Sequence, residues 1–362
     1  MKKYGVIMAG GGGTRFWPLS RKERPKQLLN LSGQDIMVNE TIDRITDAVG
    51  KGNVFIVTNV TQAALMEKET EGRMSKDHIL AEPAARNTAA CIGYAAMEIV
   101  KKYEDGIMCI LPSDHFIKNT QEYTNVINAA MEAAEETDML VTIGIKPDYP
   151  ATGYGYIKAE EGTRTDIGST GKSYQKVAEF VEKPDEETAK EYLANGNYAW
   201  NSGMFIWKAS TILKKISELL PDVYECLVQI GDAMGTPQEA EVINKVYPVI
   251  PKISIDYGIM ERSRDVLVLE GDFGWNDIGS LDMLSIMKPE DENGNVLYGE
   301  QINLDTKNCI LYGKDKLIAT IGVEDLIVIQ EKDAILICHK NKAQDVKKVV
   351  ETLAEQGKDN YL

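Results

Sequence analysis

The sequence is poor in the features that mark several classes of protein. Among its 362 residues are five cysteines and three histidines, and no two cysteines have the close spacing of a zinc site. The odd number of cysteines, their wide spacing and their apolar neighbours predict buried free thiols in a reducing compartment. We therefore expect neither a disulfide framework nor a zinc module, and we expect a cytoplasmic location.

Long apolar runs are also missing. The segment from Met1 to Ala9 holds two lysines before a short apolar run that ends in glycines, which is too short for the apolar core of a signal peptide. No later stretch is apolar for the length of a membrane span. Basic residues are scarce relative to acidic ones, 40 against 56, and the formal net charge is −16. Such a charge repels polyanions, so neither nucleic acid nor an anionic membrane is expected as a partner.

What remains is the composition of an ordinary globular protein, 43% hydrophobic and 27% charged, with a length that favours two domains. Strand-like and helix-like segments alternate through the first part, which is typical of an α/β fold with a largely parallel sheet. We predict strands at residues 4–8, 54–58, 107–111, 140–145, 204–207 and 266–270, and helices at residues 37–49, 87–103, 123–136 and 210–220. Residues 150–184 predict an inserted hairpin at the rim of the sheet.

The polar segment KPEDENGN after Ile286 is the best candidate for a domain boundary. It divides a domain of residues 1–287 from a small domain of residues 288–362. Short β pieces recur in the second domain at fairly regular spacing, which suggests stacked rungs of a β-solenoid, and a helix at residues 344–356 follows them. We expect this domain to pack against the first domain or a second copy of the chain, which would make a homodimer.

The segment AGGGGTRFWPLS, from Ala9 to Ser20, follows the first predicted strand. Four consecutive glycines let backbone N–H groups approach an anion without obstruction by Cβ atoms, which is the chemistry of a phosphate cradle. The spacing matches neither a P-loop nor a dinucleotide-binding loop. A flexible turn or a solvated basic loop is the alternative, but Thr14, Arg15 and Lys26 accompany the glycines and favour a phosphorylated ligand.

Two carboxylates stand after predicted strands, Asp114 in LPSDH and Asp277 in GDFGWNDIGS. Open α/β sheets bind ligands at the carboxyl ends of their strands, and Mg²⁺ is typically held by one or two carboxylates together with phosphate oxygens. The alternative is that Ser113 or Asp114 caps a turn and Asp277 caps a helix. We assign His115 no catalytic role, since a phosphate nucleophile needs no base. His78 and His339 are interpreted as structural.

The sequence GGGGTRFWPLSRKERPKQ resembles the signature of the sugar-phosphate nucleotidyltransferases, and its RFWPLSR…PKQ form is similar to the mannose-1-phosphate guanylyltransferases of that family. The likeness continues in the same order through AEPAARNTAA, LPSDH, ATGYGYIK, FVEKP, WNSGMFIW, SIDYGIME and GWNDIGS. It spans Gly10 to Ser280. The resemblance implies a Rossmann-like, mixed and mainly parallel sheet covered by helices, followed by a left-handed β-helix-like domain.

The resemblance also implies a role for each matching residue. The nucleotide would be bound by Gly10, Gly11, Gly12, Gly13, Thr14, Glu82, Pro83, Asn87, Thr88 and Ser113. The sugar phosphate would be bound by Gly153, Glu182, Lys183, Asn201 and Asp256. Asp114 and Asp277 would hold Mg²⁺, and Arg15, Lys26 and Lys183 would be catalytic by stabilising phosphate charge. Trp200, Phe205 and Trp207 are interpreted as core residues.

The implied reaction is transfer of GMP from GTP to α-D-mannose 1-phosphate by direct in-line attack, giving GDP-mannose and pyrophosphate. Two departures from the family pattern stand out. Leu281 replaces a frequent tryptophan. We also expect the chain to lack the isomerase half of bifunctional relatives and to perform the transfer alone. The alternatives are a thymidylyl- or uridylyltransferase that uses glucose 1-phosphate, or a non-catalytic subunit that senses nucleotide sugars.

Overall fold

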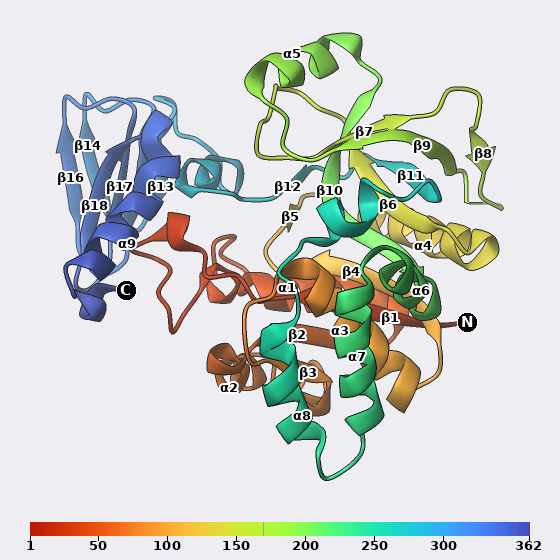
Figure 1. Ribbon diagram of the computed structural model, residues 1–362. Coiled ribbons are helices and arrows are strands. Elements are labelled where there is room, and N and C mark those ends of the chain that lie inside the picture. Colours follow the sequence, from red (N-terminus) through yellow and green to blue (C-terminus); the bar gives the residue numbers. More distant parts are fainter. Residues whose placement is uncertain (169) are drawn as a thin grey trace. The chain divides into compact units, whose positions relative to one another are not determined.

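A ten-stranded mixed sheet organises most of the chain (Figure 1). The computed structural model describes residues 1–168 and 170–362. The chain divides into two compact units. Unit 1 comprises residues 1–10, 41–113 and 117–276, and unit 2 comprises residues 11–40, 114–116 and 277–362.

The sheet of unit 1 has the strand order β3–β2–β1–β4–β10–β6–β11–β9–β7, and β8 pairs with β9. Strand β1 is parallel to β2 and β4, and β6 is parallel to β11, whereas β10 runs antiparallel to both of its neighbours, β4 and β6. The strands are β1 (Lys2–Met8), β2 (Val54–Asn59), β3 (Ile79–Glu82), β4 (Gly106–Pro112), β6 (Leu140–Ile145), β7 (Tyr156–Ala159), β8 (Thr165–Asp166), β9 (Ser173–Val181), β10 (Tyr198–Lys208) and β11 (Val266–Gly271), with two short strands, β5 (Phe116–Ile117) and β12 (Trp275–Asn276).

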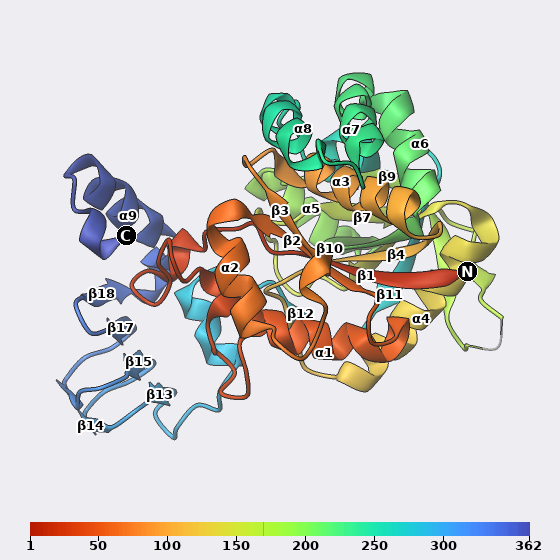
Figure 2. The same ribbon diagram turned by 90° about the horizontal axis from the view of Figure 1, so that it is seen from below.

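Helices cover both faces of the sheet, with α3, α6, α7 and α8 on one side and α1 and α4 on the other (Figure 2). Gly93 lets α3 approach α7 closely, because a Cβ at this position would overlap Leu227. The apolar residues between α3, α6, α7 and the sheet form one continuous core. The helices are α1 (Met37–Val49), α2 (Val60–Glu69), α3 (Asn87–Lys102), α4 (Thr120–Thr137), α5 (Glu186–Asn195), α6 (Ala209–Leu219), α7 (Pro221–Ala233) and α8 (Glu239–Val246).

These elements confirm the predicted α/β class and each of the six predicted strands and four predicted helices. The predicted rim hairpin is present as the antiparallel pair of β7 and β9, but both strands belong to the main sheet, because β9 also pairs with β11 and β7 also pairs with β10. Trp200, Phe205 and Trp207 are buried in this unit, as predicted. His78 is buried too, stacked on Phe55 with ring centroids 4.1 Å apart, which supports its structural interpretation.

Unit 2 joins the glycine-rich segment to a small β domain. Strands β13, β15 and β17 stack in parallel, β14 and β16 form a second parallel row, and the antiparallel strand β18 ends the stack. The elements are β13 (Val296–Tyr298), β14 (Gln301–Leu304), β15 (Ile310–Gly313), β16 (Ile318–Ile321), β17 (Leu326–Gln330), β18 (Ile335–His339) and α9 (Val346–Glu355). The predicted rungs and closing helix are therefore confirmed.

One hydrophobic core runs through unit 2. It contains Phe16, Trp17 and Leu19 from the segment after the glycines, and Val296 and Ile310 from the β strands. The limits of the compact units therefore differ from the expected boundary between residues 287 and 288. The reason is that residues 11–40 share their core with the C-terminal strands. That boundary stays a prediction about domains that fold separately.

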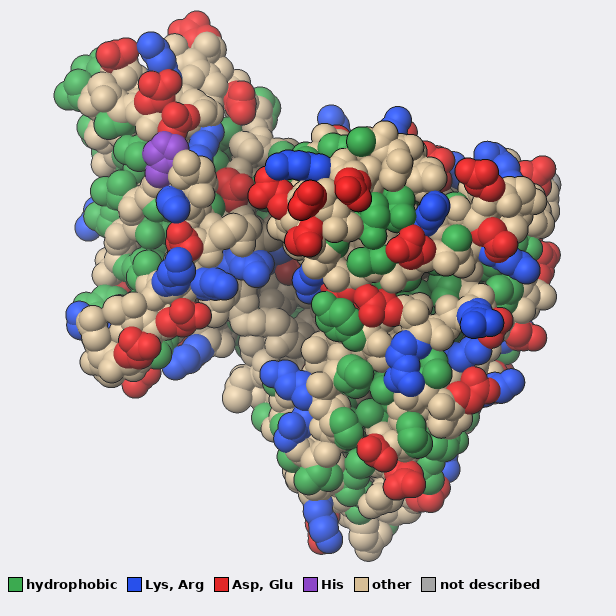
Figure 3. Space-filling view, turned by 45° about the horizontal axis from the view of Figure 1, so that its top comes forward, with side chains coloured by type: hydrophobic (Ala, Val, Ile, Leu, Met, Phe, Trp, Pro, Cys, Tyr) green, Lys and Arg blue, Asp and Glu red, His purple; other side chains and the backbone are tan. Residues whose placement is uncertain are grey.

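All five cysteines are free thiols. Cys91, Cys109 and Cys309 are buried, which confirms that part of the prediction, and Cys226 and Cys338 are half-buried. Among the described residues no helix combines the length and apolar character needed to cross a membrane. On the face shown in Figure 3, acidic and basic side chains are intermixed, so this face offers a polyanion no broad basic surface.

Candidate active site

The glycine-rich segment folds onto Lys26. Gly13 has a φ of 61°, in the left-handed region, and a Cβ there would lie 2.5 Å from Lys26 Cβ and 2.9 Å from the Lys26 backbone nitrogen. Only glycine fits such a position without strain. The segment then enters a short 3-10 helix, η1 (Thr14–Phe16), whose Phe16 is buried in the core of unit 2. The absence of a side chain at Gly13 therefore lets the glycine-rich segment pack directly against Lys26.

Lys26 is a buried cation, only 5% exposed. Its Nζ donates hydrogen bonds to Asp114 Oδ2 at 2.8 Å and to the backbone carbonyl of Asp277 at 2.8 Å. A buried ammonium needs such partners, since an isolated charge would not leave water. Lys26 thus ties together the two segments that carry the predicted metal ligands.

The Asp114 carboxylate is ionised and accessible. Burial acts to raise the pKa of Asp114, but the Lys26 ammonium and then His115 outweigh it, so the pKa is held below its ordinary value. The side chain is 33% exposed. Its charge and exposure leave it able to meet a cation or a polarised ligand from solvent.

A pocket of about 310 Å³ in unit 2 gathers most of the residues predicted for the triphosphate and the metal. Six of them line it, namely Gly13, Thr14, Arg15, Lys26, Asp114 and Asp277. Four residues without a predicted role complete the lining, namely Phe16, His115, Gly279 and Lys347. Gly11 and Gly12 lie just before this lining, and the Gly11 carbonyl accepts a hydrogen bond from Gln27 Nε2 at 3.1 Å.

The two carboxylates fit the chemistry of a Mg²⁺ site that a substrate completes. Asp114 and Asp277 line one pocket, and the Asp277 carboxylate lies close to Gly279, where a Cβ would be 3.1 Å from Oδ2. The described part of the chain contains no cluster of three or more histidine, cysteine or acidic side chains that could hold a metal alone. Magnesium characteristically takes one or two carboxylates and completes its shell with phosphates and water. The alternative, that Asp277 caps a helix, does not match the structure, because the helical turn after it begins at Leu281 with Ser280 as its N-cap.

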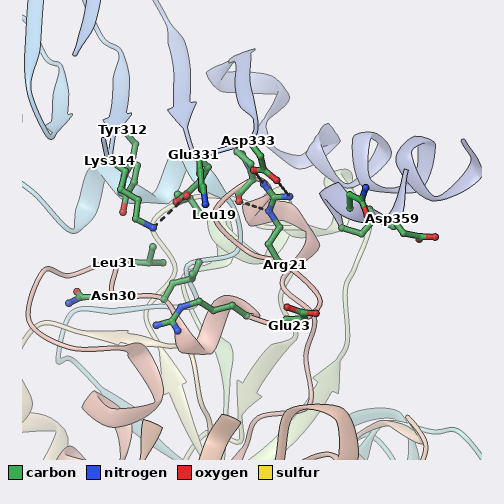
Figure 4. Close-up of a pocket in the computed structure, with 16 residues that line it drawn as sticks. Leu19, Arg21, Glu23, Asn30, Leu31, Tyr312, Lys314, Glu331, Asp333 and Asp359 are labelled. Carbon is green, nitrogen blue, oxygen red and sulfur yellow. Dashed lines mark hydrogen bonds and ion pairs between the residues drawn. The ribbon is translucent and has the colours of Figure 1, made fainter. Parts of the chain in front are cut away.

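A larger pocket of about 650 Å³ in unit 2 has a different electrostatic character (Figure 4). Its charged lining is balanced, with four basic and four acidic side chains. Arg21 pairs with Asp333 at 2.8 Å, and Lys314 lies 3.5 Å from Glu331. The basic residues between Arg15 and Lys26 are therefore divided. Arg15 and Lys26 line the smaller pocket, whereas Arg21 pairs with the β domain. A lining with balanced charge offers a polyphosphate no excess of positive charge.

The residues predicted for the sugar phosphate lie together in unit 1. Asn201 Nδ2 donates to Asp256 Oδ1 at 3.0 Å, and Lys183 Nζ lies 3.0 Å from Glu182 Oε1. The Glu182 side chain is 9% exposed and that of Lys183 is 56% exposed, so the lysine reaches solvent while the glutamate is held beneath it. Gly153, in contrast, lies in a loop with open space beside its Cα and makes none of these contacts.

The carboxylates of this group are electrostatically coupled. Burial and then the charge of Glu182 raise the pKa of Asp256 to about 6. Burial lowers the pKa of Lys183, but its hydrogen bond to Glu182 and the nearby charges raise it overall, so the lysine stays protonated. Anionic acceptors for hydroxyl groups therefore stand beside an ammonium that can bind a phosphate.

Two residues that sequence reasoning passed over shape this group. A Cβ at Gly155 would overlap Glu182 Oε2 and lie 3.2 Å from Asn201 Cβ, so only glycine leaves room for both. Glu261 Oε1 accepts a hydrogen bond from the Glu182 backbone N–H at 2.8 Å. Both residues stand inside the motifs ATGYGYIK and SIDYGIME, so the motifs carried the signal.

Further residues predicted for nucleotide binding are in unit 1, on β3 and at the start of α3. Glu82 is buried and accepts a hydrogen bond from the Tyr247 hydroxyl. Burial raises the pKa of Glu82 to about 7. Thr88 Oγ1 accepts from the Ile255 backbone N–H at 2.8 Å, and Asn87 begins the helix with a φ of 67°.

The other residues predicted for nucleotide binding in unit 1 lie at the ends of strands. The Ser113 N–H donates to the Met8 carbonyl at 3.1 Å, so Ser113 follows β4 beside the end of β1. Gly10 lies near the Glu82 carboxylate, where a Cβ would be 3.2 Å from Oε2, and Pro83 follows Glu82 directly at the end of β3. No sequence motif pointed to Tyr247, which is the partner that holds Glu82.

Two family profiles match the chain. One, described as nucleotidyl transferase, covers residues 4–294, and one, described as a MannoseP isomerase/GMP-like beta-helix domain, covers residues 299–353. Among curated relatives, a mannose-1-phosphate guanylyltransferase of Klebsiella pneumoniae is 39% identical over 98% of this chain and 75% of its own length. The alginate biosynthesis protein AlgA of Pseudomonas aeruginosa is 38% identical over 98% of this chain and 72% of its own length.

A solved structure is also similar to this chain over nearly its whole length. The crystal structure titled mannose-1-phosphate geranyltransferase, from Thermus thermophilus, superposes with a TM-score of 0.86 at 33% identity, over 98% of this chain and all of its own. The match extends through the β-helix domain as well as the nucleotidyl transferase profile. The chain therefore belongs to the nucleotidyl transferase family, among relatives named mannose-1-phosphate guanylyltransferase.

Proposed function

We propose that the chain transfers GMP from GTP to α-D-mannose 1-phosphate, giving GDP-mannose and pyrophosphate. The observation that carries the proposal is the position of Lys26, which is buried between the Asp114 carboxylate and the Asp277 carbonyl in a pocket shared with Arg15. This arrangement supplies fixed positive charge and two carboxylates at one place, as transfer from a triphosphate requires. The names of the relatives identify the base and the sugar.

In the proposed reaction an oxygen of the sugar phosphate attacks the α-phosphorus of GTP in line, and pyrophosphate leaves. Arg15 and Lys26 stabilise the charge that develops on the leaving pyrophosphate, and backbone N–H groups of the glycine-rich segment position the triphosphate. No base is needed, because the attacking oxygen already carries negative charge. No covalent intermediate with the protein forms.

Asp114 and Asp277 would hold Mg²⁺. When bound, the ion neutralises phosphate charge that the protein's own cations leave uncompensated. Lys183 binds the phosphate of mannose 1-phosphate, and Glu182, Asn201 and Asp256 accept and donate hydrogen bonds at the sugar hydroxyls. Glu82, Pro83, Asn87, Thr88 and Ser113 belong to the nucleotide-binding set together with Gly10, and Gly153 to the sugar-binding set. We also propose a cytoplasmic location.

The test is a panel of GTP, ATP, UTP and dTTP, each combined with mannose 1-phosphate and glucose 1-phosphate, with Mg²⁺ present. We expect the highest rate of pyrophosphate release from GTP with mannose 1-phosphate. Maximal release from dTTP or UTP with glucose 1-phosphate would assign the chain to another substrate pair. Pyrophosphate release from none of the eight mixtures would contradict catalysis itself.

A further inference from the structure

Lys347 lines the same pocket as Arg15 and Lys26, although it comes from the C-terminal helix α9. More than 300 residues of sequence separate it from the glycine-rich segment. Among the residues that line this pocket, Lys347 is the one that belongs to α9, the closing helix of the β-helix domain. The role of that domain in the reaction is otherwise unassigned.

Two contacts fix the start of α9 at this place within unit 2. Val346 is 2% exposed and belongs to the core that also contains Phe16, two residues after Thr14. Gln344 Nε2 donates a hydrogen bond to Ser280 Oγ at 2.9 Å, in the motif that carries Asp277. Lys347 therefore stands on a backbone held from both sides of the pocket.

The neighbouring lysines form ion pairs with Asp345, but Lys347 does not. Lys342 lies 3.8 Å and Lys348 lies 2.7 Å from the Asp345 carboxylate. Over residues 1–168 and 170–362, neither Lys347 nor Arg15 has a salt-bridge partner within 4 Å. Lys347 still attracts the Asp345 carboxylate at longer range, but Lys348 and Lys342 form the salt bridges with it. Two exposed cations that form no salt bridge with the described residues therefore border one pocket, and an anionic ligand would compensate both.

We propose that Lys347 is a further binding residue for the pyrophosphate part of the nucleoside triphosphate. The inference rests on the proposed function for the identity of the ligand. Three cationic side chains line the pocket, Arg15, Lys26 and Lys347, against the two carboxylates Asp114 and Asp277. Lys26 is already bonded to Asp114, whereas Arg15 and Lys347 form no salt bridge within the described part of the chain and can add their charge to that of Lys26 when phosphates bind. The closing helix of the β-helix domain thereby takes part in substrate binding.

The test compares the full-length variants Lys347→Ala, Lys347→Arg and Lys348→Ala. Lys348 is the matched control, because it is the next residue of the same helix but its ammonium is bonded to Asp345. Isothermal titration calorimetry would measure binding of GTP, inorganic pyrophosphate and GMP without any sugar phosphate. We expect Lys347→Ala to weaken GTP and pyrophosphate binding about 10-fold, the lower end for a charged hydrogen bond at an exposed residue.

The same account predicts that GMP binding stays within about threefold in Lys347→Ala, and that Lys348→Ala leaves all three ligands within that range. Lys347→Arg should restore most of the affinity for pyrophosphate. Equal affinities in Lys347→Ala and Lys348→Ala would overturn the inference. So would an equal loss for GMP and pyrophosphate, which would indicate a general structural effect.

The binding measurements separate this inference from the proposed function. If the wild-type chain made no GDP-mannose yet lost pyrophosphate affinity on Lys347→Ala, the inference would stand and the proposed function would fail. If the wild-type chain made GDP-mannose and Lys347→Ala bound pyrophosphate normally, the inference alone would fail. A wild-type chain that bound neither GTP nor pyrophosphate would contradict both.

Discussion

Lys26 shows what a single residue can reveal only after folding. Its place beside Arg15 after the glycines predicted a phosphate contact. Its burial and its bonds to Asp114 and to the Asp277 carbonyl could not be predicted, because they join segments 88 and 251 residues away. Local spacing carries no information about such pairs. Arg21, which looks equivalent in the sequence, pairs with Asp333 instead. Charge alone could not separate the two.

Glu82 leads to a prediction at the same scale. Its pKa is about 7 in the folded protein against an ordinary value of 4.5, and burial is the main cause. Between these values the folded state binds more protons than the unfolded state, so this group makes stability fall as pH rises. The gap corresponds to at most about 3 kcal/mol. Below pH 4.5 Glu82 is protonated in both states, so its contribution to stability no longer changes with pH.

We therefore expect the Glu82→Gln variant to gain stability relative to wild type as pH rises, so that the difference between their free energies of unfolding shifts by about 2 kcal/mol in favour of the variant between pH 5 and pH 8. Urea unfolding at several pH values would measure this difference. Tyr247 keeps a hydrogen-bond acceptor in the variant, so loss of that contact should not dominate. A difference between the two proteins that is constant over this pH range would contradict the account.

At the scale of elements, apolar runs predicted the central strands β1, β2, β4, β6 and β11 well, because these strands are buried. Strand β10 was predicted at only four residues, and it has eleven. The missing part contains Asn201, Ser202 and Gly203, where the register shifts and Gly203 adopts a φ of 70°. The strand is polar there, and Asn201 forms hydrogen bonds with Asp256 and Thr142. Tertiary contacts therefore override the apolar strand pattern at this point.

Helices α2, α5, α7 and α8 and strand β3 were not predicted. In α2 and α5 the apolar periodicity is weak, so tertiary packing decides their structure. Helices α7 and α8 carry a clear amphipathic pattern that the prediction passed over. The sequence motifs predicted which residues form the triphosphate, nucleotide and sugar-phosphate groups of the candidate site. The contacts within each group, such as that of Thr88 with Ile255, depend on distant segments and could not be predicted.

The glycine-rich segment gives a prediction that distinguishes two neighbouring glycines. At Gly13 an added Cβ meets Lys26 and the backbone is left-handed, whereas at Gly12 nothing lies within 4 Å. Gly13→Ala should destabilise the protein by about 2 kcal/mol or more and weaken GTP binding. Gly12→Ala should leave stability nearly unchanged but still weaken GTP binding, because a Cβ would stand where phosphate approaches.

Thermal unfolding and GTP titration of both variants would measure these effects. The pair is internally controlled, since the same substitution is made at adjacent positions of one loop. Normal GTP affinity in Gly12→Ala would show that this backbone does not face the phosphates. Unchanged stability in Gly13→Ala would contradict the close packing of this loop on Lys26.

For the whole molecule, the core of unit 2 joins the segment after the glycines to the β-helix strands. Removal of residues 288–362 would expose Phe16, Trp17 and Leu281, which are buried there. We expect residues 1–287 alone to melt about 10 °C or more below the full chain and to bind GTP weakly. A truncated chain with the full chain's melting temperature and GTP affinity would instead support two independently folding domains.

The pairing of the glycine-rich segment with the C-terminal strands could not be predicted from the sequence, because a polar linker suggested a boundary and no local signal links residues so far apart. Lys347 was overlooked for the same reason. It lies outside every motif, and only the fold of unit 2 brings it to Arg15 and Lys26.

The most direct test of the central claim follows the phosphorus atom itself. GTP labelled with ³²P at the α-phosphate would be incubated with the protein, Mg²⁺ and mannose 1-phosphate, and the products separated after denaturation. The account predicts that the label is recovered in GDP-mannose, in equal amount to the pyrophosphate released, and that none stays on the protein. Label recovered as free GMP, or bound covalently to the denatured chain, would contradict direct transfer to the sugar phosphate.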